Sequence, residues 1–290
     1  MKLIIISGLS GSGKTVALHT LEDEDYYCVD NLPIGLLPQF VERILSRKVQ
    51  LYDNIAVGID ARSDPADLRD FNTIFEWIQQ RDTETKIEIE IVYIQAELDT
   101  LIKRFSDTRR RHPLTKKGLP LSEAIEVERN LLKDVATAAN LYIDTTHTNI
   151  HELRSYIKER IAKRQQTKLS LLFNSFGFKN GAPADSDFVF DVRCLPNPHW
   201  EPNLRALTGQ DTEVIAFLQD QEEVQQMLEH IKDFLSFVIP KFIKQNRYYI
   251  TVSIGCTGGQ HRSVYIAETL HENFRSQLEH VSIHHRELSR

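Results

Sequence analysis

The stretch Gly8-Leu9-Ser10-Gly11-Ser12-Gly13-Lys14-Thr15 matches the pattern G-x-x-x-x-G-K-[ST] of a phosphate-binding loop. Residues 2–7, an apolar run rich in β-branched side chains, predict a buried strand before it, and residues 14–22 predict a helix after it. Glycines let the backbone curve closely around phosphates, so that successive N–H groups and the positive end of the helix face the same anionic oxygens. This context favours a nucleoside triphosphate site over an ordinary glycine-rich turn.

The last two residues of the loop carry the expected chemistry. We expect Lys14 to reach the β- and γ-phosphates and the Thr15 hydroxyl to bind Mg²⁺. A carboxylate at the end of a neighbouring strand must also hold the Mg²⁺ or its water. Asp30, directly after the predicted strand 26–29, is the best placed, and Asp60 is the alternative. Either carboxylate could instead cap a helix or a turn.

A basic segment follows later in the same half of the chain. Residues 103–117 contain seven lysines and arginines and one acidic residue, Asp107. Such dense cations repel one another unless an anion lies among them, and a triphosphate, with one arginine stabilising the transferring charge, fits that role. A solvated helix end and RNA phosphate are the alternatives. No acceptor pocket or general base is evident, so slow hydrolysis of ATP or GTP is an alternative to a small-molecule kinase.

Length and composition limit the class of protein. A chain of 290 residues predicts two domains, and 41% hydrophobic with 26% charged residues is typical of a soluble globular protein. The net charge of −6 argues against a protein that binds nucleic acid non-specifically over its whole surface, although it permits a local basic patch. Cys28, Cys194 and Cys256 show no metal-ligand spacing, which indicates reduced thiols. No apolar stretch approaches the ~20 residues of a membrane helix, and we expect a cytoplasmic protein.

Strand and helix patterns alternate along the first half. The expected strands are residues 2–7, 26–29, 55–59, 87–95 and 141–143. The expected helices are residues 14–22, 36–47, 65–80, 98–110, 122–139 and 150–164, with an N-cap at Asp64 and a capping box at Asn149. The pattern predicts an α/β fold, a P-loop kinase-like parallel sheet with helices on both faces.

A polar stretch at 165–168 predicts a linker, which gives domains 1–165 and 166–290. The second domain is predicted to be a smaller α/β unit. Its expected strands are residues 169–173, 188–192, 248–254 and 280–284, and its expected helices are residues 222–245, interrupted at Pro240, and 264–275.

The second domain has its own strand–loop–helix motif. Residues 256–262 satisfy C-x₅-R and Ser263 follows, which is the spacing of cysteine-dependent phosphatases. Tight glycines after a strand, a helix N-terminus and the forked cation of Arg262 suit phosphate or a phosphosugar. Covalent catalysis by Cys256 and a merely buried cysteine in a glycine turn remain alternatives. Asp191 and Arg193 lie at the end of another predicted strand, 188–192, where they could orient a ligand or form a salt bridge.

Several motifs occur together in this order. They are residues 8–15, Asp30-Asn31-Leu32-Pro33, Arg104-Phe105-Ser106-Asp107-Thr108-Arg109-Arg110, Ser175-Phe176-Gly177-Phe178-Lys179, Phe190-Asp191-Val192-Arg193 with Leu195-Pro196-Asn197-Pro198, and residues 255–263. With them the chain resembles the RapZ/YvcJ nucleotide-binding family from end to end. The resemblance implies that residues 8–15 bind and hydrolyse ATP and GTP. It also implies a second nucleotide-associated segment, Asp60-Ala61-Arg62-Ser63, and a homo-oligomer.

The enterobacterial branch of that family adds further expectations. Its members are RNase adapters that bind small RNAs, present one to RNase E and sense glucosamine-6-phosphate through the C-terminal domain. Carried over, the sugar-phosphate pocket would consist of Asp191, Cys256, Thr257, Gly258, His261 and Arg262. The expected output is control of amino-sugar synthesis.

The C-terminal tail departs from that branch, whose members end in a Lys/Arg-rich tail used for RNA. Here three arginines are balanced by three glutamates within residues 271–290, and four histidines add charge only when protonated. Each missing cation removes a phosphate contact. RNA binding is therefore less supported than nucleotide or sugar-phosphate binding.

Overall fold

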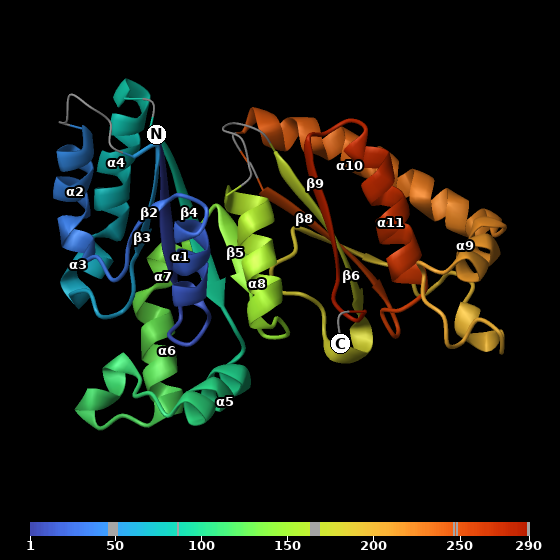
Figure 1. Ribbon diagram of the computed structural model, residues 1–290, viewed down its shortest axis with the longest axis horizontal. Coiled ribbons are helices and arrows are strands. Elements are labelled where there is room, and N and C mark those ends of the chain that lie inside the picture. Colours follow the sequence, from blue (N-terminus) through green and yellow to red (C-terminus); the bar gives the residue numbers. More distant parts are fainter. Residues whose placement is uncertain (46–51, 86, 163–168, 246, 248, 289–290) are drawn as a thin grey trace. The chain divides into compact units, whose positions relative to one another are not determined.

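Two separate sheets of parallel strands organise the chain (Figure 1). The computed structural model describes residues 1–45, 52–85, 87–162, 169–245, 247 and 249–288. The chain divides into two units, Met1–Lys163 and Arg164–Arg290. Each unit has its own sheet and its own hydrophobic core.

The sheet of the first unit has five strands in the order β2-β3-β1-β4-β5, and all neighbouring pairs are parallel. The strands are β1 (Lys2–Gly8), β2 (Tyr27–Val29), β3 (Asn54–Gly58), β4 (Glu88–Gln95) and β5 (Leu141–Asp144). All five correspond to strands predicted from the sequence. Because the strands are parallel, the segments that follow them gather at one edge of the sheet, where α/β proteins bind their ligands.

Helices cover both faces of this sheet, as the sequence predicts. They are α1 (Lys14–Glu22), α2 (Leu37–Leu45), α3 (Pro65–Arg69), α4 (Phe71–Thr85), α5 (Leu98–Thr108), α6 (Leu121–Leu131), α7 (Lys133–Thr137) and α8 (Ile150–Ile157), with short 3₁₀ segments at Ile34–Leu36 and Pro113–Lys117. Leu3 and Ile5 of β1 share a core cluster with side chains of α2, α4 and α7. Side chains alternate along a strand, so the equally buried Ile4 and Ile6 face the other side, where α1 contacts the sheet.

Three predicted helices differ from those in the structure. The segment 65–80 is split at Asp70 and the segment 122–139 at Leu132, because both residues adopt the bridge region with ψ near 7°. The apolar pattern continues across each break, so periodicity did not reveal it. After α8 the chain continues as a π-helical segment, Lys158–Ala162. The predicted helix ends at 46–47 and 163–164 lie outside the described residues.

The second unit contains a four-stranded parallel sheet in the order β7-β8-β6-β9. Its elements are β6 (Ser170–Gly177), β7 (Phe188–Asp191), α9 (Thr212–Gln219), α10 (Glu222–Lys244), β8 (Tyr249–Cys256), α11 (Arg262–Arg275) and β9 (His280–His285), with 3₁₀ segments at Phe178–Asn180 and Pro198–Trp200. The predicted interruption at Pro240 is wrong, because α10 runs through this residue. Buried Ile239 and partly buried Phe242 contact the core on either side of Pro240 and hold this last part of the helix in place.

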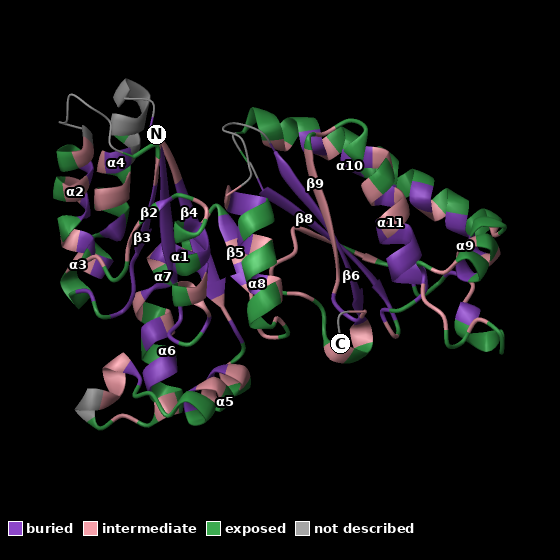
Figure 2. Cartoon of the chain, in the orientation of Figure 1, coloured by how far each residue is buried: buried purple, intermediate pink, exposed green. Residues whose placement is uncertain are grey.

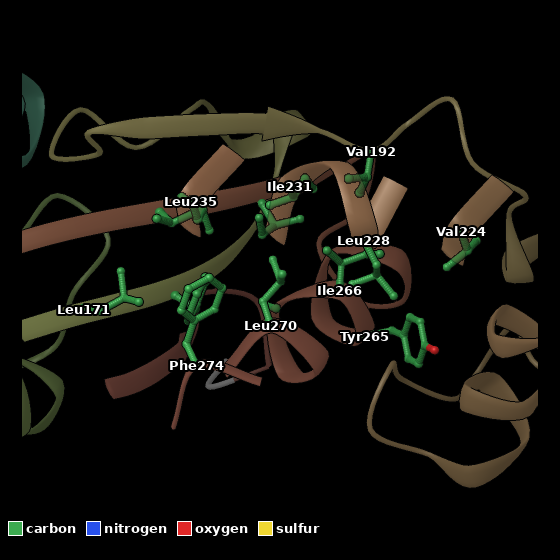
Figure 3. Close-up of a cluster of buried hydrophobic side chains, with 14 of the residues drawn as sticks. Leu171, Val192, Val224, Leu228, Ile231, Leu235, Tyr265, Ile266, Leu270 and Phe274 are labelled. Atoms are coloured by element: carbon green, nitrogen blue, oxygen red, sulfur yellow. The ribbon is translucent and has the colours of Figure 1, made fainter. Parts of the chain in front are cut away.

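Side chains of the helices and the sheet meet in the core of the second unit. Figure 3 shows Leu171 of β6 near Phe274 and Leu270 of α11, with Leu228, Ile231 and Leu235 of α10 facing them. The buried positions of α10 recur every three to four residues, so one face of this helix is covered and the other is exposed (Figure 2). This core holds the carboxyl end of β8 and the start of α11, between which the second motif lies.

Candidate functional site

The phosphate-binding loop lies where the sequence predicts it, between β1 and α1. Gly8, Gly11 and Gly13 have φ values of 137°, 85° and 115°, which side chains of L-residues rarely allow. A Cβ at Gly8 would overlap the carbonyl oxygen of Ile94 on the neighbouring strand. The backbone conformation therefore favours glycine at all three positions, and close contact with β4 adds a second requirement at Gly8.

The carbonyl groups of the loop are fixed by residues from distant parts of the chain. Arg104 donates from Nη1 to the carbonyl of Gly11 (3.1 Å), and the buried Thr145 hydroxyl donates to the carbonyl of Ser12 (2.8 Å). Arg104 also bonds to Thr145, which ties the two anchors together. Anchored carbonyls orient the peptide planes of the loop.

Several N–H groups of the same loop, unlike its carbonyl groups, have no hydrogen-bond partner among the described residues. Within the described part of the chain, no acceptor lies in hydrogen-bonding range of the backbone N–H of Gly11, Gly13, Lys14 or Thr15. The Ser12 hydroxyl oxygen is buried and has no partner among the described residues. Converging N–H groups at the start of a helix form an anion site, so the loop fits a phosphate group.

Lys14 lies across the loop and donates to the carbonyls of Gly8 (2.7 Å) and Leu9 (3.1 Å). Burial lowers the pKa of Lys14, and the charges of Glu128, Asp60 and Asp30 oppose that shift in this order. The charges of three carboxylates thus act on the Lys14 ammonium group.

The two candidate magnesium carboxylates are in different environments. Asp60, directly beyond β3, is buried, and both of its oxygens accept from Arg62, with Nη2–Oδ2 at 2.6 Å. Burial raises the pKa of Asp60, but its bonds to Arg62 outweigh this effect and lower it. Asp30 at the end of β2 and Thr15 at the start of α1 are exposed. Exposed oxygens suit Mg²⁺, which keeps several waters, so Asp30 and Thr15 fit the ion better than Asp60 does.

The segment Asp60-Ala61-Arg62-Ser63 is mostly buried. Ala61 and Ser63 are nearly inaccessible, and the Ser63 hydroxyl accepts from the N–H of Ile34 (3.4 Å). The Arg62 side chain is half exposed. Of this segment, Arg62 is therefore the residue most able to contact a nucleotide, and the second nucleotide-associated role stays a prediction.

The basic segment is not one uniform patch. Arg104 is partly buried and anchors the phosphate loop, whereas Lys103, Arg109, Arg110 and Arg111 are exposed. The side chains of Lys116 and Lys117 lie outside the described residues. The predicted contact of the exposed arginines with a triphosphate stays a prediction.

Sequence reasoning missed two buried residues at the loop, Glu128 and His112. Glu128 accepts from the N–H of Ser10 (2.8 Å) and from its hydroxyl (2.7 Å), and His112 Nε2 lies 3.0 Å from the same carboxylate. Their only sequence signal was the position of His112 at the end of the basic segment.

The second motif joins β8 to α11. Cys256 is buried, and its sulfur accepts from the N–H of Gly259 (3.2 Å) and lies 3.2 Å from the Ser263 hydroxyl. Thr257 is exposed and Gly258 is partly exposed. Among the described residues, the N–H groups of Thr257, Gly258, Gln260 and Arg262 have no acceptor in range. This turn therefore presents a second set of donors at a helix start.

The described residues satisfy the guanidinium group of Arg262 only in part. Nη1 donates to the carbonyls of Arg193 (2.8 Å) and Leu195 (2.9 Å), and Nη2 lies 3.4 Å from the Thr257 hydroxyl. Nε is buried, and no partner for it exists among the described residues. Leaving a buried donor unsatisfied costs about 1–3 kcal/mol, so an acceptor such as a phosphate oxygen would be stabilising here.

Asp191 and Arg193 form the salt bridge that was one of the two alternatives for this pair. Arg193 Nε donates to both oxygens of Asp191 at 3.0 Å, and Nη2 donates to Oδ2 at 2.7 Å. These bonds lower the pKa of Asp191, and the charge of Arg262 adds to the effect. The Asp191 carboxylate is therefore held in its ionised form, as an acceptor of hydrogen bonds.

His261 is buried directly before α11, and its Nε2 lies 3.2 Å from the carbonyl of Leu204. Burial lowers the pKa of His261, which the bond to Leu204 only partly offsets. A neutral imidazole held in this way can position the loop or donate a hydrogen bond, but it adds little positive charge at neutral pH.

The remaining observations concern metals and membranes. Within the described residues there is no group of three or more His, Cys, Asp or Glu side chains arranged to hold a metal ion. No helix in the described ranges has the length and apolar character needed to cross a bilayer.

The fold and the comparison with known proteins together define the family of the chain. A parallel sheet in the order β2-β3-β1-β4-β5, with a glycine-rich loop after its central strand, makes the first unit a P-loop kinase-like α/β domain. Family models match both halves: the RapZ-like N-terminal domain over residues 1–165 and the RapZ C-terminal domain over residues 169–289. The chain belongs to the RapZ family, which confirms the resemblance found in its motifs.

Similar proteins cover the whole chain. A nucleotide-binding protein of Thioalkalivibrio sulfidiphilus is 53% identical over 290 residues, and one of Nitrosococcus oceani is 55% identical over 289 residues, with 100% of each chain covered in both cases. Among solved structures, shikimate kinase from Bacteroides thetaiotaomicron aligns with 54% of this chain and 94% of its own, at 15% identity and a TM-score of 0.34.

Proposed function

We propose that this protein binds ATP or GTP with Mg²⁺ at residues 8–15 and hydrolyses it slowly as part of a regulatory role. The observation that carries the proposal is the set of loop N–H groups without acceptors, oriented by anchors at Gly11 and Ser12. The nucleotide-binding names of full-length relatives support it.

The roles of the side chains follow from their positions. Lys14, now held on the carbonyls of Gly8 and Leu9, would turn to the β- and γ-phosphates, and Thr15 and Asp30 would hold Mg²⁺. The ion would neutralise charge that develops on the phosphate oxygens. Arg62 and the exposed arginines at 109–111 are the cations available to the rest of the nucleotide.

Titration calorimetry of the full chain with a non-hydrolysable ATP or GTP analogue and Mg²⁺ tests the nucleotide site. We expect saturable binding that Lys14→Ala weakens by at least about tenfold, because a charge-assisted phosphate contact is lost. Lys133→Ala, on the exposed surface of α7, is the matched control and should bind as the wild type does. Equal affinity of the Lys14 and Lys133 variants would refute this assignment.

We also propose that the loop between β8 and α11 senses a sugar phosphate, with glucosamine-6-phosphate as the first candidate. The support is the unsatisfied Arg262 Nε beside N–H groups without acceptors at the start of α11. Thr257 and Gly258 are accessible from this loop, and the Asp191 carboxylate offers an acceptor for an amine or hydroxyl group. Cys256 and His261 would shape the pocket rather than react.

The further proposals rest on family membership: a small-RNA and RNase adapter role in the control of amino-sugar synthesis, a cytoplasmic location and a homo-oligomer. Retention of a labelled small RNA at physiological salt tests the adapter role. We expect retention to fall when exposed cations such as Arg110 and Arg275 are neutralised. Unchanged retention would place the RNA contact elsewhere.

A small-molecule kinase is the alternative, favoured by the kinase-like sheet of the first unit. A kinase transfers the γ-phosphoryl group to an acceptor, so a true acceptor would be phosphorylated and would stimulate nucleotide turnover. Turnover that a panel of sugars and hydroxy acids leaves unchanged supports hydrolysis as the reaction.

A further inference from the structure

Glu128 and His112 form a buried pair against the phosphate loop. Glu128 lies on α6, 118 residues from Ser10, and both of its oxygens accept from that residue: Oε2 from the N–H (2.8 Å) and Oε1 from the hydroxyl (2.7 Å). Both members of the pair are almost completely inaccessible to solvent. A buried carboxylate that accepts hydrogen bonds from both the backbone N–H and the hydroxyl group of one loop residue fixes that residue in a single conformation.

The carboxylate of Glu128 is held in its ionised form. Burial raises the pKa of Glu128, but the hydrogen bond from His112, the charge of Lys14 and the bonds from Ser10 outweigh it and lower the pKa. Of the three carboxylates that act on Lys14, Glu128 has the strongest influence. Since Lys14 is the residue proposed to reach the β- and γ-phosphates, Glu128, bonded to Ser10 of the same loop, would act near the reacting end of a bound nucleotide.

His112 connects this carboxylate to the exposed arginines. Its Nδ1 accepts from the N–H of Leu114 (3.2 Å), so the proton of the neutral ring is on Nε2, which donates to Glu128 at 3.0 Å. The ring also contacts Phe105 of α5, with centroids 5.3 Å apart. Since His112 directly follows Arg109-Arg110-Arg111, its attachment to Glu128 limits how far these arginines can lie from the loop.

We propose that His112 and Glu128 are positioning residues for nucleotide hydrolysis. They hold Ser10 in place and keep the arginines at 109–111 close to the γ-phosphate. In hydrolysis the water oxygen bonds to the γ-phosphorus, and the bond to the β–γ bridging oxygen breaks with its electron pair on the diphosphate. One proton is released to solvent. His112 and Glu128 take up no proton themselves. Replacing either residue would misplace the arginines that stabilise negative charge on the phosphate oxygens in the transition state, so turnover would fall more than nucleotide binding.

The inference rests on the proposed nucleotide hydrolysis. The experiment compares full-length wild type with Glu128→Gln and with Glu126→Gln as the matched control, because Glu126 lies on the same helix and is exposed. For each protein, kcat is measured with Mg²⁺ and ATP or GTP. Affinity for a non-hydrolysable analogue and thermal unfolding are measured in parallel.

We expect Glu128→Gln to lower kcat on the order of 10²-fold, the size of effect that small misplacements cause. Analogue affinity should change less than about threefold, and Glu126→Gln should behave as the wild type does. His112→Gln keeps a donor near Glu128, whereas His112→Ala removes it, so the alanine variant should be the slower of the two. This order distinguishes positioning from a general loss of stability.

Three results would overturn the inference: unchanged kcat in Glu128→Gln, equal losses of kcat and of analogue affinity, or a wild type that binds nucleotide without turning it over. The last result leaves nucleotide binding intact. A wild type that binds no analogue would instead refute the proposed function itself. If Glu128→Gln fails to fold, the same comparison of kcat and analogue affinity in the two His112 variants tests whether the pair positions the loop for hydrolysis.

Discussion

Arg286 donates from Nη2 to the carbonyl of Gly177 (3.1 Å), which ties the end of the described chain to the end of β6. The same guanidinium bonds to the carbonyl of Gly181 (2.6 Å) and to Glu287 (3.1 Å). Glu287 in turn accepts from Asn180 and lies against Gly259 of the second loop. Arg286 and Glu287, which the sequence counts only as opposite charges of a charge-balanced C-terminal segment, are therefore buried supports of the candidate sugar-phosphate site.

Arg286→Ala should lower the free energy of unfolding of the second unit by about 1–3 kcal/mol, because the buried carbonyl of Gly177 loses a donor and the more exposed carbonyl of Gly181 loses one as well. Arg275→Ala removes an exposed cation from an i,i+3 pair with Glu272 and should change stability by less than about 0.5 kcal/mol. Chemical denaturation followed by circular dichroism measures both. Equal effects of the two variants would contradict the supporting role of Arg286.

Gly259→Ala should destabilise the second loop, whereas Gly258→Ala should not. Gly259 has φ of 73°, and a Cβ there would collide with Glu287 and Gly177, whereas a Cβ at Gly258 meets no atom within 4 Å. We expect a loss of about 1–3 kcal/mol for the first variant and less than about 0.5 kcal/mol for the second. Thermal unfolding of the two variants measures this difference in stability. If Gly258→Ala is as unstable as Gly259→Ala, the loop does not have the conformation described above.

Asn149→Ala should destabilise the first unit by about 1 kcal/mol through the loss of a helix cap. The Asn149 side chain accepts from the N–H of His151 (2.9 Å) and Glu152 (3.0 Å), and Glu152 completes the capping box. His151→Ala removes an exposed side chain on the same turn and serves as the control. Equal denaturation midpoints for Asn149→Ala and His151→Ala would contradict the capping role of Asn149.

Acidification should destabilise the wild type more than His261→Gln. The pKa of His261 is lowered from the usual 6.5 in the folded protein, so the unfolded chain binds more protons between the two values. The stability due to neutral His261 is complete above pH 6.5 and is lost as the pH falls through the lower folded value. Melting temperatures of both proteins from about pH 8 to about pH 5 measure this window. Parallel curves would show that His261 does not titrate in this way.

The sequence predicted what depends on local patterns. The residues of the phosphate loop are contiguous, so their glycines, Lys14 and Thr15 could be recognised directly, and local sequence patterns predicted each strand of the two described sheets. The cap at Asn149 is equally local, since it involves only residues 149–152.

Contacts between distant residues could not be predicted in this way. Ser10 and Glu128 are 118 residues apart, and Arg104 reaches Gly11 across 93 residues. Arginines count equally as charges in a sequence, yet Arg286 is buried while Arg109 is exposed. Only the fold decides which cations support a loop and which can meet a ligand.

A sugar-phosphate site at the second loop is tested by calorimetric titration of glucosamine-6-phosphate into the full chain, as wild type and as Arg262→Ala, with Arg275→Ala as control. We expect saturable binding by the wild type and the control, and loss of binding in Arg262→Ala, because the unsatisfied Nε and the forked cation are removed. No binding to a wild type whose nucleotide site is intact, or equal binding by all three proteins, would contradict a sugar-phosphate sensor at this loop.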